Sequence, residues 1–208
     1  MNDVANRQVR HILSLSGGKD SAALAVYMRD RVDDMEYIFH DTDKELPDTY
    51  RYLDRLEDYL GKRIVRTTFG TTFDNLLRLY GGMLPSNHRR WCTRMMKLKP
   101  FEEYIGDEPC INYVGIRADE DRVGYISHKA NITAVFPFRD DGIDYDGVQR
   151  ILKDSGIGMP PYTEWGRTRS GCFFCFYQQK IEWVRLKQRY PQYFEEAKAY
   201  ERPNRVNG

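Results

Sequence analysis

The sequence predicts an α/β fold with a five-stranded, mostly parallel sheet and helices on both faces. Two observations carry this prediction. Short apolar runs alternate with amphipathic helical patterns along the first 160 residues, and a strand that follows a helix of this length implies a parallel βαβ unit. The chain has 208 residues, is 41% hydrophobic and carries a net charge of +1. Such a length and composition suit one domain, or one domain with a small appendage.

The expected elements follow from local periodicity. Strands are expected at 10–15, 36–40, 63–69, 111–116 and 132–136, and helices at 20–31, 47–60, 72–80 and 145–153. Pro47 suits the first turn of the second helix, and Gly61 suits its end. A soft boundary near Pro160 separates a domain of residues 1–160 from a small helical appendage of residues 161–208.

A glycine turn joins the first strand to the first helix, in the run Ser-Leu-Ser-Gly-Gly-Lys-Asp-Ser from Ser14 to Ser21. Gly17 and Gly18 lack Cβ atoms, so the backbone N–H groups can approach an anion closely. The helix start that follows adds the positive end of its dipole, and Asp20 or Ser21 is expected to cap it. Neither the Walker nor the Rossmann spacing fits. The run predicts a phosphate cradle, with an ordinary glycine turn as the alternative.

Ser16–Ser21 resembles the pyrophosphate loop, Ser-Gly-Gly-x-Asp-Ser, of the ATP pyrophosphatase or adenine nucleotide alpha-hydrolase superfamily. The resemblance implies that ATP is cleaved between its α and β phosphates, so that AMP is attached to a substrate oxygen and pyrophosphate leaves. It implies ATP binding by Ser14, Ser16, Gly17, Gly18, Lys19, Asp20, Ser21, Asp41 and Thr42. The expected catalytic residues are Lys19, which neutralises developing charge, Asp20 or Asp41, which holds Mg²⁺, and Arg117, which binds phosphate.

Three further segments resemble the phosphoadenylylsulfate reductase family. His40–Asp43 followed by Pro-x-Thr49 is similar to that family's Asp-Thr-Gly and Pro-x-Thr, although Asp43 stands where the family usually has glycine. Gly115–Arg122 loosely matches its Gly-x-Arg-x-x-Glu run, with a surface Glu–Arg network as the alternative. Gly166–Cys175 closely resembles its C-terminal cluster motif.

The four cysteines are expected to be metal ligands or reactive thiols, because disulfides are rare in the cytoplasm, where we place the protein. The CxxC spacing of Cys172 and Cys175 lets two sulfurs reach one metal. Cys92 stands before a Lys-x-x-Pro run, as a cysteine of the reductase family does. The resemblance implies a [4Fe–4S] cluster on Cys92, Cys172 and Cys175 with one open position. Cys110 is the candidate fourth ligand or a semi-buried thiol, and zinc, with Cys110 or His88, is the alternative metal.

Between Arg89 and Lys99 lie five basic residues and no acid. The stretch indicates a polyanion surface, with a solvated charged helix as the alternative. The whole pattern most resembles the ATP pyrophosphatase component of DNA phosphorothioation systems. That resemblance implies that a cysteine desulfurase supplies the sulfur and that nucleic acid is the substrate, with DNA favoured over tRNA. It also implies further modification subunits and no membrane partner, and it is compatible with a homo-oligomer. The alternatives are tRNA base thiolation, a non-hydrolysing ATP sensor or scaffold, and sulfonucleotide reduction, which the lack of a cysteine after Cys175 disfavours.

Overall fold

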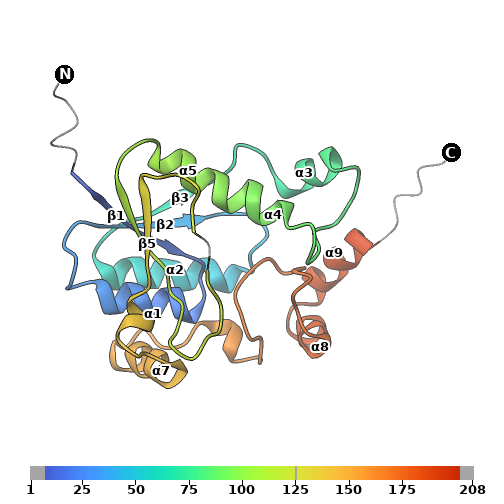
Figure 1. Cartoon of the computed structure of the whole chain (residues 1–208). Helices are drawn as coiled ribbons and strands as arrows, with labels where there is room; N and C mark the ends of the chain where they lie inside the picture. Colours follow the sequence, from blue (N-terminus) through green and yellow to red (C-terminus); the bar gives the residue numbers. More distant parts are fainter. Residues whose placement is uncertain (1–7, 125, 202–208) are drawn as a thin grey trace.

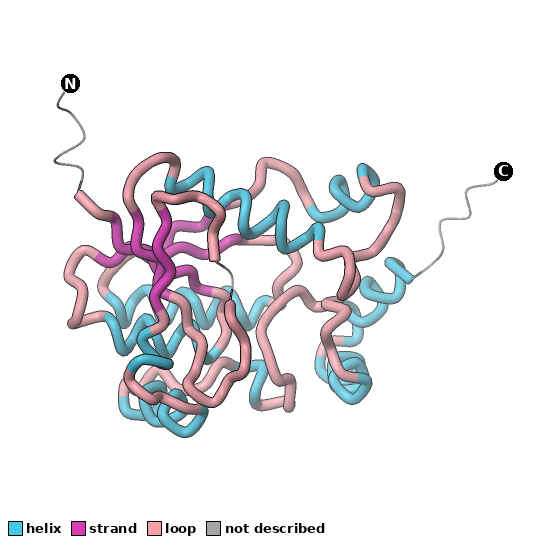
Figure 2. The backbone as a smooth tube through the Cα atoms, viewed as in Figure 1, coloured by secondary structure: helices cyan, strands magenta, loops and turns pink. Residues whose placement is uncertain are grey.

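The computed structural model describes residues 8–124 and 126–201, and its centre is a parallel sheet of five strands (Figures 1 and 2). Their order across the sheet is β3-β2-β1-β4-β5, and every neighbouring pair is parallel. The strands are β1 (Arg10–Leu15), β2 (Met35–His40), β3 (Ile64–Thr67), β4 (Cys110–Tyr113) and β5 (Ile132–Val135). The predicted fold class is confirmed, and the five expected strands form, some of them shorter than expected.

Helices cover both faces of the sheet, as the alternation of side chains along the strands requires. Leu13 and Phe39 pack on one face with the helices α1 (Lys19–Met28), α2 (Pro47–Leu60) and α7 (Tyr145–Asp154). Ile12 and Ile38 point to the other face, where they pack with α5 (Lys99–Ile105). Figure 1 shows α1, α2 and α7 below the strands and α5 above them. Both apolar layers are therefore buried.

The basic stretch of the sequence belongs to a helix. It runs through α4 (Trp91–Thr93), a π-helical turn (Arg94–Leu98) and α5. Single π turns shift the helical register by one residue and often occur at functional sites. The helix is the one that the alternative interpretation of this stretch foresaw, and the polyanion surface stays a prediction.

Helix α1 starts one residue earlier than expected and has a different cap. Gly18 occupies the N-cap position and supplies no side chain, so the expectation that Asp20 or Ser21 caps this helix was wrong. Both residues lie inside the first turn, where Asp20 binds Arg117 and Ser21 binds Ser16. Their side chains are engaged with the site rather than with the helix end.

The C-terminal helices α8 (Lys180–Arg189) and α9 (Pro191–Glu201) pack against each other and against the sheet domain. Tyr200 donates a 2.6 Å hydrogen bond to Asp74 of α3 (Phe73–Leu79), and Phe173 N–H donates to the Lys44 carbonyl at 2.8 Å. The boundary near Pro160 stays a prediction. Two short elements complete the fold, α6 (Pro137–Asp140) and a 3-10 turn (Pro161–Thr163). Among the described helices, none has the length and apolar character needed to cross a membrane.

Candidate functional site

The turn between β1 and α1 has a shape that requires glycine. Gly17 has a φ of +67°, and a Cβ atom at this position would overlap Cγ2 of Thr49. A Cβ on Gly18 would lie 2.8 Å from Oγ of Ser170. The left-handed conformation and the two close neighbours leave no room for a side chain. The predicted turn thus forms at the carboxyl edge of the sheet, where ligands of open α/β folds bind.

Hydroxyl groups surround this turn. Ser16 N–H donates to Ser21 Oγ at 3.2 Å, and Ser170 Oγ donates to Ser16 Oγ at 3.4 Å. The hydroxyl of Tyr162 accepts a 3.1 Å hydrogen bond from the Lys19 N–H. The N–H groups of Ser16 and Lys19 therefore donate to hydroxyl oxygens, and phosphate oxygens are acceptors of the same kind.

A charged network closes the other side of the turn. Nζ of Lys19 lies 3.3 Å from one oxygen of Asp20, and Arg117 donates to its other oxygen at 2.8 Å. Arg117 also pairs with Asp119 and Glu120 at 2.8 and 3.0 Å. Burial lowers the pKa of Arg117, but the hydrogen bonds that Arg117 donates to Asp119 and Asp20 outweigh this effect and raise that pKa above its ordinary value. Asp20 is engaged on both oxygens, so a Mg²⁺ ion must compete with Arg117 or Lys19 for it.

The turn lines a cavity of about 590 Å³, which we call the nucleotide cavity. Its walls come from the turn itself, the segment after β4 and the loop before the CxxC motif. The lining residues are Ser16, Gly18, Lys19, Asp20, Ser21, Gly115, Arg117, Glu120, Asp121, Arg122, Tyr162, Thr168, Arg169 and Ser170. Five of the sequence-predicted ATP-binding residues, Ser16, Gly18, Lys19, Asp20 and Ser21, lie here together with the predicted catalytic Arg117.

Asp41, Thr42 and Ser14 do not line this cavity. One oxygen of Asp41 accepts hydrogen bonds from the Tyr50 hydroxyl at 2.7 Å and the Asp43 N–H at 2.8 Å. Asp43 has a φ of +62°. Because that conformation favours glycine, the position explains why the resembling motif usually has glycine there. Asp43 adopts it with the help of the Asp41 carboxylate.

Cys92, Cys172 and Cys175 line a second cavity of about 280 Å³, here called the thiol cavity. Aromatic side chains form much of its wall: Phe73, Phe174, Phe176, Trp183 and Tyr200. The three cysteines that the sequence predicted to converge are therefore brought to one place. His88 is exposed and does not line this cavity.

Cys110 lies elsewhere, so its assignment as a fourth ligand was wrong. It begins β4, is 2% exposed and packs among Ile12, Ile38 and Phe101 under α5. Burial raises the pKa of its thiol to about 11. The alternative interpretation, a buried thiol of the core, is the one that the structure supports.

Buried charges lie beside the thiols. Burial raises the pKa of Cys172 to about 12, and burial also raises the pKa of Glu45. Burial lowers the pKa of Lys97, but the charges of Glu45 and the cysteines bring it above its ordinary value. Glu45 Oε2 and Arg167 Nε are buried without a hydrogen-bond partner in the described part of the chain. Polar atoms in this state usually mark a missing ligand or water.

Three thiols with buried cations nearby fit a negatively charged, thiolate-bound group in chemical character. Within residues 8–124 and 126–201, however, no three His, Cys, Asp or Glu side chains are grouped closely enough to hold one metal ion. A metal or cluster on Cys92, Cys172 and Cys175 thus requires the sulfurs to draw closer together. The thiol-to-thiolate change would accompany this, because metal ligands bind deprotonated.

One loop serves both cavities. Thr168, Arg169 and Ser170 line the nucleotide cavity, while Cys172 and Cys175 line the thiol cavity. The loop is anchored by Arg167, which donates to the Cys172 carbonyl at 2.8 Å, and by Glu182, which accepts the Thr168 N–H at 2.6 Å. Sequence reasoning assigned this motif to the metal alone. Arg169 and Ser170 were the sequence signal that could have revealed its place at the nucleotide cavity. No sequence signal pointed to Tyr162.

Among the comparisons with known proteins, a family model gives the family. The profile of the phosphoadenosine phosphosulfate reductase domain matches residues 10–175. An uncharacterized protein of Methanocaldococcus jannaschii is 28% identical in an alignment of length 199 that covers 87% of this chain and 45% of that protein. The chain thus spans less than half the length of this relative.

Solved structures support the fold. The phosphoadenylyl-sulfate reductase of Candida auris, in a phosphate complex, superposes with a TM-score of 0.65 at 12% identity over 81% of this chain and 83% of that chain. The NH3-dependent NAD synthetase of Campylobacter jejuni superposes with a TM-score of 0.52 at 14% identity over 95% and 86%. At such identities the likeness extends to the architecture.

Proposed function

The chain belongs to the phosphoadenosine phosphosulfate reductase domain family, and on this basis we propose that it is an ATP pyrophosphatase that activates a nucleic-acid oxygen for replacement by sulfur. The observation that carries the proposal is the loop shared by the nucleotide cavity and the thiol cavity. Activation by ATP and delivery of sulfur need neighbouring sites. DNA backbone phosphorothioation is the favoured reaction, because the sequence most resembles that class of enzyme.

In the activation step, the glycine turn holds the β and γ phosphates of ATP. A substrate oxygen attacks the α phosphorus, the bond from that phosphorus to the bridging oxygen breaks, and pyrophosphate leaves with the electron pair. Lys19 and Arg117 line the nucleotide cavity and would neutralise this negative charge, and fixed charges of this kind are the largest catalytic contribution in many enzymes. When phosphate takes over these cations, Asp20 becomes available to hold Mg²⁺.

In the sulfur step, a sulfur nucleophile held in the thiol cavity attacks the activated atom, and AMP leaves with the former substrate oxygen. A [4Fe–4S] cluster bound by Cys92, Cys172 and Cys175 would supply iron that holds sulfide, and zinc is the alternative metal. Lys97 and Arg167 would balance the charge of the thiolates. A cysteine desulfurase is the expected sulfur donor, together with further modification subunits, and tRNA base thiolation is the runner-up reaction.

The first experiment separates ATP products. The protein is incubated with α-labelled ATP, Mg²⁺ and single-stranded DNA, duplex DNA or tRNA, and AMP, ADP and pyrophosphate are quantified. Without a sulfur donor, we expect nucleic-acid-dependent release of pyrophosphate and transfer of the α-label, as AMP, to the nucleic acid. In Lys19→Ala we expect a loss of at least a hundredfold, because the removal of one charge aimed at the transition state costs about that much. ADP and phosphate as the products, or consumption of a sulfonucleotide without ATP, would exclude the proposal.

The second experiment tests the thiol cavity without relying on activity. The wild type, Cys172→Ser and Cys110→Ser are purified under anaerobic conditions, and their iron, acid-labile sulfide and zinc contents are measured. We expect metal in the wild type and in Cys110→Ser, and strongly reduced metal in Cys172→Ser with ATP binding retained. Equal metal contents in the two variants would remove the thiol cavity from the mechanism.

A further inference from the structure

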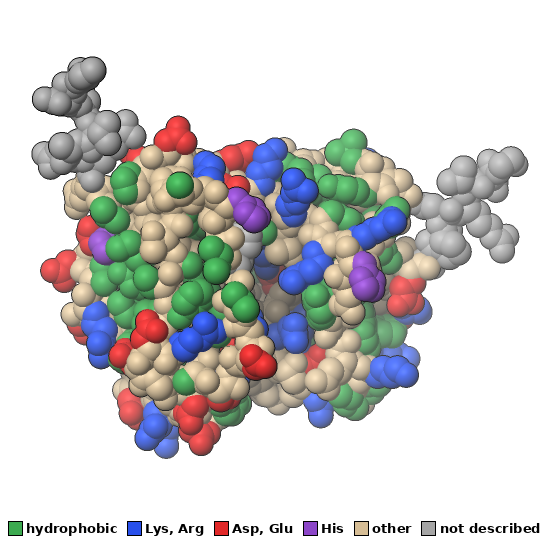
Figure 3. Space-filling model, in the orientation of Figure 1, with side chains coloured by type: hydrophobic (Ala, Val, Ile, Leu, Met, Phe, Trp, Pro, Cys, Tyr) green, Lys and Arg blue, Asp and Glu red, His purple; other side chains and the backbone are tan. Residues whose placement is uncertain are grey.

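The largest of the cavities described here is a groove that neither half of the proposed reaction uses. It has a volume of about 1240 Å³ and lies between the α4–α5 helix and the segment between β4 and β5. Its lining residues are Arg90, Thr93, Arg94, Leu98, Lys99, Glu102, Arg122, Gly124, His128 and Lys129. In Figure 3, Lys and Arg side chains gather around the hollow in the middle of the visible face. We call this feature the basic groove.

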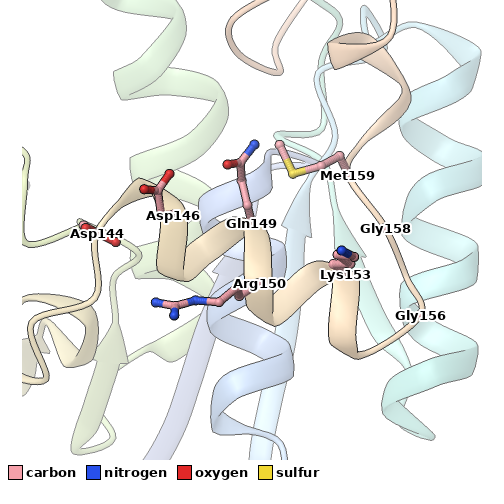
Figure 4. A pocket seen from close by; sticks show the side chains of 8 residues that line it. All are labelled: Asp144, Asp146, Gln149, Arg150, Lys153, Gly156, Gly158 and Met159. Atoms are coloured by element: carbon pink, nitrogen blue, oxygen red, sulfur yellow. The ribbon is translucent and has the colours of Figure 1, made fainter.

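The charge of the basic groove is unbalanced. Its lining has five Lys and Arg side chains and a single carboxylate. Two of these cations, Lys99 and Arg122, pair with Glu103 and Glu120 outside the lining, so the excess of positive charge comes from the other three. A groove beside α7 offers a comparison within the same molecule, because it is lined by Asp144, Asp146, Arg150 and Lys153 and carries no net charge from them (Figure 4). The near-neutral chain as a whole thus concentrates positive charge in one concave place. Such a place attracts a polyanion.

The basic groove adjoins the nucleotide cavity. Arg122 lines both. The guanidinium groups of Arg90, from the groove, and Arg169, from the nucleotide cavity, each lie 5.3 Å from the ring centre of Tyr177. Tyr177 follows Cys175 by two residues, so this junction also adjoins the thiol cavity. A chain of cations therefore leads from the surface to the point where the proposed reaction takes place.

Two exposed apolar side chains stand near groove residues in the sequence. Val123 is 72% exposed and Ile126 is 57% exposed, next to the groove residues Arg122 and Gly124. Gly124 has a φ of +83°, and a Cβ there would lie 2.6 Å from Ile116. The backbone at Gly124 is therefore closely packed against Ile116. Cations along a groove with apolar groups at its edge match the phosphates and the bases of one nucleic-acid strand.

We propose that the basic groove binds a single-stranded segment of nucleic acid and leads one of its nucleotides into the nucleotide cavity. The part of the inference that leads a nucleotide into the nucleotide cavity rests on the proposed function. The binding site itself is inferred from the charge and shape of the groove. A duplex keeps the faces of its bases stacked inside, whereas an extended strand exposes phosphates and base faces together. The two sources of such a strand, DNA and RNA, share this chemistry and are separate arms of the test.

The test measures binding of fluorescently labelled oligonucleotides of about 12 nucleotides, a length within the range of known single-strand sites. Arg94→Ala/Lys99→Ala removes two exposed cations of the basic groove. Arg150→Ala/Lys153→Ala is the matched control, because it removes one arginine and one lysine from exposed positions in the other groove. Anisotropy titrations over a range of salt concentrations give the affinity and its salt slope, and thermal unfolding confirms that both variants fold.

We expect single-stranded DNA or RNA to bind more tightly than the duplex. Loss of two phosphate contacts should reduce the salt slope by about 1.4 and weaken binding roughly 25-fold at 0.1 M salt, while the control pair changes neither. Equal losses in the two variants, or equal binding of duplex, would overturn the proposal. Strand binding without pyrophosphate release would leave the groove intact and remove the proposed function. Pyrophosphate release without strand binding would overturn the proposal for the groove and leave the proposed function standing.

Discussion

The glycine turn allows a stability experiment that isolates one close contact. Gly17 and Gly61 have nearly the same φ, +67° and +63°, in the left-handed region. They differ in surroundings, because a Cβ on Gly17 overlaps Thr49 whereas a Cβ on Gly61 meets nothing within 4 Å. Alanine at either position has the cost of a left-handed residue, about 1–2 kcal/mol. Alanine at Gly17 has an additional overpacking cost of about 1–3 kcal/mol.

Urea unfolding of Gly17→Ala, Gly61→Ala and the wild type measures these costs, and the difference between the two variants isolates the contact. Thr49→Ser removes the Cγ2 atom that the new Cβ would meet while it keeps the hydroxyl. We therefore expect Thr49→Ser to recover about 1–3 kcal/mol in the Gly17→Ala background and to destabilise the wild-type background slightly. Equal unfolding free energies of the two alanine variants, or no coupling with Thr49→Ser, would refute the steric argument.

Three further predictions concern single side chains. Burial, with the nearby Lys97, lowers the pKa of His40 from 6.5 to about 4. Below pH 6.5 the unfolded chain therefore binds more protons than the folded chain, and stability decreases as the pH falls. Between pH 7 and pH 5, the free energy of unfolding in urea should decrease by about 2 kcal/mol more in the wild type than in His40→Asn. Tyr162→Phe, which removes the acceptor of the Lys19 N–H, should destabilise the free protein by about 1 kcal/mol and the ATP-saturated protein by less, as thermal unfolding will report. Cys110, whose pKa burial raises to about 11, should resist iodoacetamide at pH 8 when peptides are analysed by mass spectrometry, and modification as fast as that of an exposed thiol would contradict its burial.

The sheet could be predicted from sequence because each strand is a local apolar run and each connection has helical length. The same local signals overestimated the ends of strands. The expected strand 111–116 pairs only as far as Tyr113, since the chain leaves the sheet there to form the wall of the nucleotide cavity. Where a strand ends is decided by its neighbours, and no pattern within the segment contains that information.

The residues of the candidate site also divide into those that the sequence could predict and those that it could not. The turn from Ser16 to Ser21 was predictable because six consecutive residues determine its conformation. Tyr162 was not, because its contact with Lys19 joins positions 143 residues apart. Cys110 was misassigned since a cysteine looks the same in sequence whether it faces a core or a site. Thr42 was assigned to ATP, yet its hydroxyl lies 3.3 Å from Cys172 Sγ.

The position of Thr42 explains why the two cavities adjoin. Ser16 follows β1 and Thr42 follows β2, and these strands are neighbours in the sheet, about 4.8 Å apart. The C-terminal loop crosses the ends of both strands, so that Ser170 meets Ser16 at 3.4 Å and Cys172 meets Thr42 at 3.3 Å. Two residues of extended chain span roughly 7 Å, enough to step from one strand end to the next. The spacing between phosphate turn and thiols is therefore set by the sheet itself.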